Sequence, residues 1–194
     1  MAWAKNGTPS TLTGTADVIT ISDLTAKTNL VVLWHRLNSG ASAGKITFNS
    51  DTGYNYARRH SYNGGGDSTS TIGTGVNIYA NDTTPNFVIC YIINISTQEK
   101  LFMNFCVEQN TAGAGTAPNR VENIGKWANN SSQITRIDVT NTEAGDFAIG
   151  SNLSAIGTTG DEVLYKIQNG TVFEETDTNR SYIFNATTST WVQI

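Results

Sequence analysis

The sequence predicts an all-β protein: a jelly-roll-like β-sandwich followed by a small C-terminal antiparallel β-meander. Three observations favour this fold class. Almost no window shows the 3.6-residue apolar period of an amphipathic helix. Short apolar runs alternate instead with polar turn formers. Charged residues make up only 14% of the 194-residue chain, so its polarity comes mainly from neutral side chains that suit strands and turns.

The strands are expected, in chain order, at residues 17–22, 29–38, 45–49, 54–62, 76–80, 87–94, 100–108, 133–140 and 147–151. Thr135, Ile137 and Val139 share one face of the eighth segment, as in a half-buried strand. Residues 119–127 are expected to form a short helix or an extended loop, and the Gly-rich runs 63–67 and 111–116 flexible loops. This strand density favours a jelly roll. An immunoglobulin fold is disfavoured, since its Cys…Trp…Cys spacing is missing.

Three parts of the chain are expected. Residues 1–15 form a polar N-terminal arm, in which Trp3 is the candidate docking residue. Residues 16–157 form the β-sandwich, and residues 158–194 the meander, which begins near Val163 after a short linker at 156–161. If the arm docks on a neighbouring subunit, deletion of residues 1–14 should abolish incorporation into particles and leave the fold intact.

Two cysteines lie in neighbouring predicted strands. A hairpin whose register is symmetric about Gln98 would place Cys90 directly across from Cys106. A disulfide is then geometrically conceivable. The alternative is two buried thiols that act as small apolar residues, which synthesis in a cytoplasm favours.

The sequence offers little for catalysis or metal binding. His35 and His60 are isolated from other metal-ligating residues, and no zinc spacing or Gly-x-Ser-x-Gly turn occurs. Glu175 and Asp177 could share a strand face as a pair of carboxylates, but a solvated face or turn caps are the favoured explanation. Asp51 and Asp67 could contribute to a calcium site, although no dense Asp-x-Asp pattern is present. We therefore expect no enzyme, no metal and no cofactor.

Charge and hydropathy limit the partners. The formal net charge of −4 provides no basic field for nucleic acid. No run of 18 apolar residues could span a membrane. The first residues lack both a basic and an apolar segment, so synthesis in a cytoplasm without classical export is expected.

An aromatic group in the sandwich is the candidate binding surface. It contains Tyr54, Tyr56, Arg58, Tyr62 and Trp127. The rings could stack on sugar faces or contact another subunit. Alternatively, the even spacing of the three tyrosines would place them on one strand face that packs against the core.

The C-terminal 25 or so residues resemble a module found in many virion proteins of tailed phages. Its pattern, G-x-x-(Y/F)-x-E-T-D-T followed by Tyr, an aromatic, Asn or Asp, and Trp, is matched by Phe173, Glu175, Thr176, Asp177, Thr178, Tyr182, Phe184, Asn185 and Trp191. The Gly expected after Asn185 is replaced by Ala186-Thr187-Thr188. The resemblance implies a module core of Phe173, Tyr182, Phe184 and Trp191.

The first domain is similar to a family of structural proteins from marine phages and related tailed viruses. The similarity rests on residues 46–59, 63–67, 112–120, 125–129, 134–139 and 145–151. It implies a non-enzymatic protein of the virion surface, made in the host cytoplasm: a capsid decoration protein or a tail or fibre component. Its partners would be copies of itself, as a homotrimer, and other virion proteins such as the major capsid or tail proteins. A lectin-like module for host or surface glycans and a hydrolase on a β-sandwich are the alternatives.

Overall fold

The computed structural model describes residues 3–78, 83–159, 169–185, 187–188 and 190–194, and these contain strands and no helix. The chain divides into two compact units, residues 2–160 and residues 161–194. The first unit contains two sheets that pack face to face, and the second contains a small antiparallel sheet. The predicted all-β sandwich is confirmed, while its assignment as a jelly roll stays a prediction.

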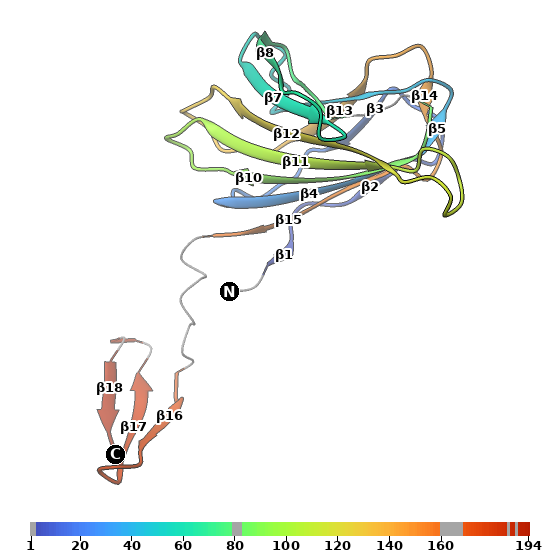
Figure 1. The fold of residues 1–194 in the computed structure, drawn as a ribbon. Coiled ribbons are helices and arrows are strands. Elements are labelled where there is room, and N and C mark those ends of the chain that lie inside the picture. Colours follow the sequence, from blue (N-terminus) through green and yellow to red (C-terminus); the bar gives the residue numbers. More distant parts are fainter. Residues whose placement is uncertain (1–2, 79–82, 160–168, 186, 189) are drawn as a thin grey trace. The chain divides into compact units, whose positions relative to one another are not determined.

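The larger sheet of the first unit has nine strands, all paired antiparallel. Figure 1 shows its long central strands side by side. In spatial order the strands are β1 (Ala4–Lys5), β15 (Asn152–Thr158), β4 (Asn29–Arg36), β10 (Asn86–Ile93), β11 (Lys100–Glu108), β12 (Asn119–Trp127), β7 (Tyr56–Tyr62) and β8 (Ser68–Gly73), with β2 (Ser10–Thr11) also paired to β15.

The smaller sheet has four strands, in the order β3 (Val18–Ile21), β13 (Ile137–Asn141), β6 (Gly44–Phe48) and β9 (Val76–Asn77). A separate pair joins β5 (Asn38–Ser39) to β14 (Asp146–Phe147). Alternate residues of β13 and β6 point inward, as period-two strands with one buried face require.

Aromatic side chains fill the space between the sheets. Phe48 contacts Phe102 and Trp127, each with ring centroids 5.8 Å apart. Tyr56 stacks on Trp127 at 6.3 Å with an interplanar angle of 16°. These rings are buried, so β6, β7, β11 and β12 meet in one apolar core.

The C-terminal unit is a three-stranded meander. Its strands are β16 (Val172–Glu175), β17 (Arg180–Asn185) and β18 (Thr190–Gln193). Glu175 pairs with Arg180 across a four-residue turn, in which Asn179 has a φ of +52°. Asn tolerates this left-handed conformation better than most residues. The predicted start near Val163 lies outside the described residues.

Three expectations about local structure are wrong. The strand expected at 147–151 is mostly the turn between β14 and β15. Residues 119–127 form the nine-residue strand β12 and not a helix or loop. Its buried positions Val121, Asn123 and Trp127 include an Asn, which hides the two-residue period. The expected linker at 156–161 is part of β15 as far as Thr158.

The N-terminal segment is not a free arm. Ala4 and Lys5 pair with β15, and Ser10 and Thr11 pair with it further along. The buried side chain of Asn6 donates to the Thr25 carbonyl oxygen at 3.0 Å and accepts from the Thr25 N–H at 2.9 Å. The segment is therefore integral to the first unit, because leaving it would expose these hydrogen-bonding groups.

The β10–β11 hairpin exists, but its register differs from the expected one. Cys90 lies opposite Asn104, and Cys106 lies opposite Val88. Both cysteines point into the core and are not joined by a disulfide. Burial raises the pKa of the Cys90 thiol to about 12. The buried-thiol alternative therefore describes them.

Candidate interaction surface

The aromatic group predicted as a binding surface is not assembled on the surface. Tyr56 and Trp127 lie in the core. The Tyr56 hydroxyl accepts a hydrogen bond from the Phe48 N–H at 2.9 Å and donates to the Asp51 carbonyl oxygen at 3.0 Å. Trp127 Nε1 donates to the Asp51 carboxylate at 2.6 Å. Tyr56 and Trp127 are thus structural, and their proposed contact with a glycan or subunit is wrong.

The other three members of that group are separated from one another. Tyr54 precedes β7 and is 73% exposed, and Tyr62 at the far end of β7 is half-exposed. Arg58 points inward, where it donates to the Asn77 carbonyl oxygen at 2.9 Å and to Asn123 Oδ1 at 3.2 Å. The three tyrosines therefore do not form one face.

The four C-terminal aromatics lie close together, but Phe173 and Trp191 are exposed, so they do not form a buried core. Trp191 lies 5.3 Å from Phe184 and 6.0 Å from Phe173, measured between ring centroids. Phe173 lies 6.4 Å from Tyr182. All four side chains project from one face of the meander, because their register pairs Phe173 with Tyr182 and Phe184 with Trp191.

Exposed apolar side chains gather on the face of the nine-stranded sheet that points away from the smaller sheet. They come from alternate positions of β10 and β11 and from the centre of β12. We call this set the outer apolar face: Phe87, Tyr91, Ile93, Leu101, Met103, Phe105, Val107 and Ile124. Register places its members across from one another, for example Tyr91 opposite Met103 and Met103 opposite Ile124. The face is therefore contiguous over three neighbouring strands.

In strand β11 the distribution of polar and apolar side chains is the reverse of that in an ordinary surface strand. Its outward residues Leu101, Met103, Phe105 and Val107 are all apolar and exposed. Its inward positions include Lys100, Asn104 and Glu108, all fully buried. A strand with one solvated face normally shows the reverse pattern.

Most of the inward polar groups of β11 have hydrogen-bond partners, although the buried Nδ2 of Asn104 has none. Lys100 Nζ donates to the carbonyl oxygens of Gln98 and Asn129 at 2.7 and 2.8 Å and lies 5.8 Å from the Trp127 ring centroid. Burial lowers the pKa of Lys100. Asn104 Oδ1 accepts from Asn123 Nδ2 at 2.9 Å. The chain thus buries polar groups on the side where its own second sheet packs.

A groove of about 760 Å³ lies over one end of the outer apolar face. Tyr91, Met103 and Ile124 line its floor, and Trp3 is among its lining residues. Trp3, the predicted docking residue, is half-exposed beside β1. Its ring therefore contributes to the same apolar surface as β10–β12.

The charges beside this face occur as pairs within the chain. Lys126 Nζ lies 2.7 Å from Glu99, and Arg120 lies 3.7 Å from Glu122. Further along, Arg59 lies 3.3 Å from Asp67. These exposed pairs add little stability, but they leave the surroundings of the face close to neutral.

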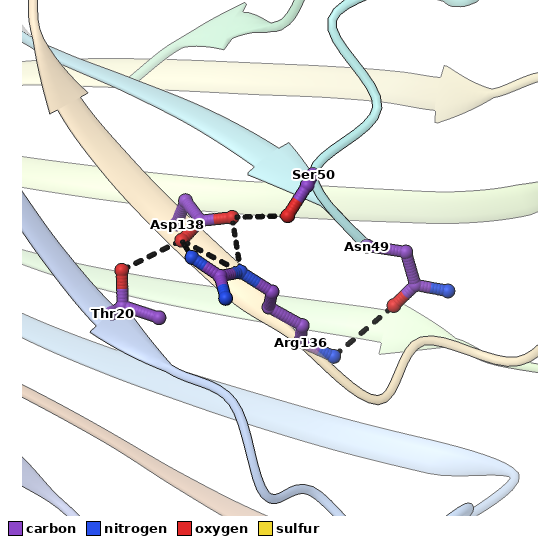
Figure 2. Close-up of polar contacts among 5 residues, drawn as sticks. All are labelled: Thr20, Asn49, Ser50, Arg136 and Asp138. Atoms are coloured by element: carbon purple, nitrogen blue, oxygen red, sulfur yellow. Dashed lines mark hydrogen bonds and ion pairs between the residues drawn. The ribbon is translucent and has the colours of Figure 1, made fainter.

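A second polar cluster lies on the smaller sheet, as Figure 2 shows. Arg136 Nη2 donates to the Asp138 carboxylate at 2.7 Å, and Thr20 Oγ1 donates to it at 2.6 Å. Burial opposes ionisation of Asp138, but these hydrogen bonds and the Arg136 charge outweigh it and hold its pKa below the ordinary value. Asn49 Oδ1 accepts from the Arg136 N–H at 3.1 Å. The cluster ties the turn after β6 to β13.

Asp51 has a comparable structural role. Burial alone would raise the pKa of the Asp51 carboxyl. Hydrogen bonds from Trp127, from Asn55 and from the Gly53 N–H outweigh that effect, so the pKa lies below its ordinary value. Asp51 therefore stabilises the turn between β6 and β7, whereas Asp138 lies within strand β13. Within the described ranges, no group of three or more His, Cys, Asp or Glu residues could hold a metal ion. In the same ranges, no helix has the length and hydropathy needed to cross a bilayer.

Sequence reasoning missed the outer apolar face, although it assigned β10 and β11 correctly as strands. The signal was present in the residues. Positions of both parities are apolar in β10, which is typical of a strand buried on both faces. In β11 the uniformly apolar positions are those at 101, 103, 105 and 107.

Comparisons with protein-family models, with curated proteins and with solved structures find no match to this chain.

Proposed function

We propose that this protein is a non-enzymatic structural component of a tailed-phage virion, a capsid decoration protein or a tail or fibre part that assembles symmetrically. The observation that carries the proposal is the outer apolar face. A contiguous exposed apolar sheet face is typical of a surface that associates with another protein. Chemistry on a substrate would instead require convergent ionisable groups in a cleft.

The C-terminal unit supports the virion assignment through its resemblance. The pattern of Glu175, Thr176, Asp177 and Thr178 falls at the β16–β17 turn, where Thr178 Oγ1 donates to the Glu175 carboxylate. Glu175 therefore has a local role at this turn. That role supports a binding module over a pair of catalytic carboxylates.

Two aromatic residues on which the carbohydrate-binding alternative depended are not available on the surface. This alternative requires rings that can lie flat against a sugar, and both Tyr56 and Trp127 are buried. Tyr54 and Tyr62 remain exposed at opposite ends of the β7 region. No observation therefore favours a glycan site over an association surface.

The proposal is tested by immunogold electron microscopy of particles from the source culture, with antibody against the recombinant chain. Gold distributed over heads would identify a capsid decoration protein, and gold at one pole a tail or fibre component. Particles without gold, from a culture in which the antibody detects the expressed chain, would refute the virion role. A glycan array should show no saturable signal, and a signal lost in Tyr54→Ala would instead establish the lectin-like function.

A further inference from the structure

We propose that the outer apolar face is buried against the same face of a second copy of this chain. The inference deepens the proposed function, on which it rests for the expectation of symmetric assembly. Its own argument comes from area, polarity and charge.

The exposed apolar area matches one side of a stable protein interface. The eight side chains of the face are between 38% and 58% exposed. Apolar side chains of this size present on the order of 200 Å² each when fully exposed. The face therefore offers roughly 750 Å² of apolar side chain, against about 800 Å² per partner in a standard interface and about 300–600 Å² for the largest patch of a typical monomer.

The composition favours a copy over an unrelated protein. All eight members of the face are uncharged, and the charged residues beside them, Glu122 opposite Phe105 and Lys126 opposite Leu101, are paired with other residues of the chain. Homodimer interfaces are more apolar than interfaces between proteins that also exist separately. The strand pattern agrees, because β11 has apolar residues where solvent would otherwise be and polar residues inside.

Charge also favours a copy. Lys126 with Glu99 and Arg120 with Glu122 are paired within one chain. The surroundings of the face therefore select neither an acidic nor a basic partner. Two copies can approach without like-charge repulsion, because each brings neutralised pairs.

A two-fold axis that lies in the plane of the face and crosses the strands would bring the face against itself. Such an axis sets β11 against β11 of the copy and reverses its direction, so that each end of the face meets the other end. The groove lies toward the end that includes Tyr91, Met103 and Ile124, and a second, smaller hollow of about 200 Å³ lies toward the other end, where Phe87 and Phe105 are among its lining residues. In this arrangement the groove of each copy would face the phenylalanine end of the other, and side chains of the two faces would interdigitate as in sheets packed about 10 Å apart.

The test is the molar mass of the full-length chain in solution, measured by sedimentation velocity between about 0.1 and 50 μM, the range in which specific complexes of this size dissociate. We expect the wild type to be a dimer or a closed multiple of it. Met103→Glu places a carboxylate at the centre of the face and should raise the dissociation constant at least about 100-fold. Ile149→Glu is the matched control, because Ile149 is exposed (60%, against 47% for Met103) but lies in the β14–β15 turn.

Thermal melting checks that each variant is folded. If Met103→Glu is not, Leu101→Glu replaces it, since Leu101 is among the most exposed members of the face. A monomeric wild type, or folded variants that keep the wild-type mass, would overturn the inference. If Met103→Glu dissociates the dimer but immunogold labels no virions, self-association through the outer apolar face is supported and the virion role is refuted. The two proposals can therefore fail separately.

Discussion

Tyr56 provides the sharpest test of the core, because a single oxygen can be removed without changing the packing. In Tyr56→Phe the ring remains stacked on Trp127, 6.3 Å away, and retains its contact with Phe48. What disappears is the acceptor of the Phe48 N–H and the donor to the Asp51 carbonyl oxygen. The substitution therefore isolates the two hydrogen bonds from the aromatic contacts.

The expected cost follows from burial. Phe48 is fully buried, so water cannot replace the lost acceptor of its N–H. An unsatisfied buried donor costs about 1–3 kcal/mol. We expect the free energy of unfolding of the first unit to fall by about 2 kcal/mol, and its Tm by roughly 4–8 °C for a domain of this size.

The assay is urea and thermal unfolding followed by tryptophan fluorescence, since Trp34 and Trp127 are buried in the first unit. Tyr54→Phe is the matched control, because the Tyr54 side chain is 73% exposed and should unfold as the wild type does. If Tyr56→Phe changes stability by less than about 0.5 kcal/mol, within the range of surface substitutions, the hydrogen-bonded core position of Tyr56 is refuted.

Three further predictions concern other parts of the first unit. The pKa of Asp138 is depressed in the folded state, so the ionised carboxylate stabilises the fold above about pH 4, and this stabilisation is lost as the pH falls below that. Between about pH 5 and about pH 3, the urea midpoint of Asp138→Asn should therefore change less than that of the wild type. An equal change in the two midpoints would contradict this prediction. Cys90 and Cys106 should react with Ellman's reagent only after denaturation, since both thiols are buried; rapid labelling of the native protein would count against it. Deletion of residues 1–14 should lower the Tm, because it removes β1, β2 and the buried Asn6; an unchanged Tm would restore the original expectation of a detachable arm.

Much of the strand pattern could be predicted from local sequence. Residues 29–36 and 100–108 are long apolar or alternating runs bounded by turn formers, and both form strands near the predicted limits. The period of two is sufficient for such segments. Strand β8 at 68–73 was missed, because its Ser and Thr residues are almost all exposed and give no alternation.

Properties that depend on pairing could not be predicted in the same way. The register of the β10–β11 hairpin differs by two residues from one symmetric about Gln98, which separates Cys90 from Cys106. A shift of two keeps every side chain on its own face, so the apolar pattern cannot distinguish the two registers. The aromatic group failed for a related reason: Trp127 turns inward because residues 119–127 form a strand.

The direction in which β11 faces connects the fold to the proposed assembly. Read alone, its uniformly apolar side at Leu101, Met103 and Phe105 would be assigned to the core, and the side with Lys100, Asn104 and Glu108 to solvent. The structure does the opposite, and supplies Lys100 with three backbone carbonyl partners to make that burial tolerable. A strand with this composition is explained when both of its faces are covered, one by the smaller sheet and one by a second copy. The same residues that mislead an assignment of inside and outside are thus those that the proposed second copy would cover.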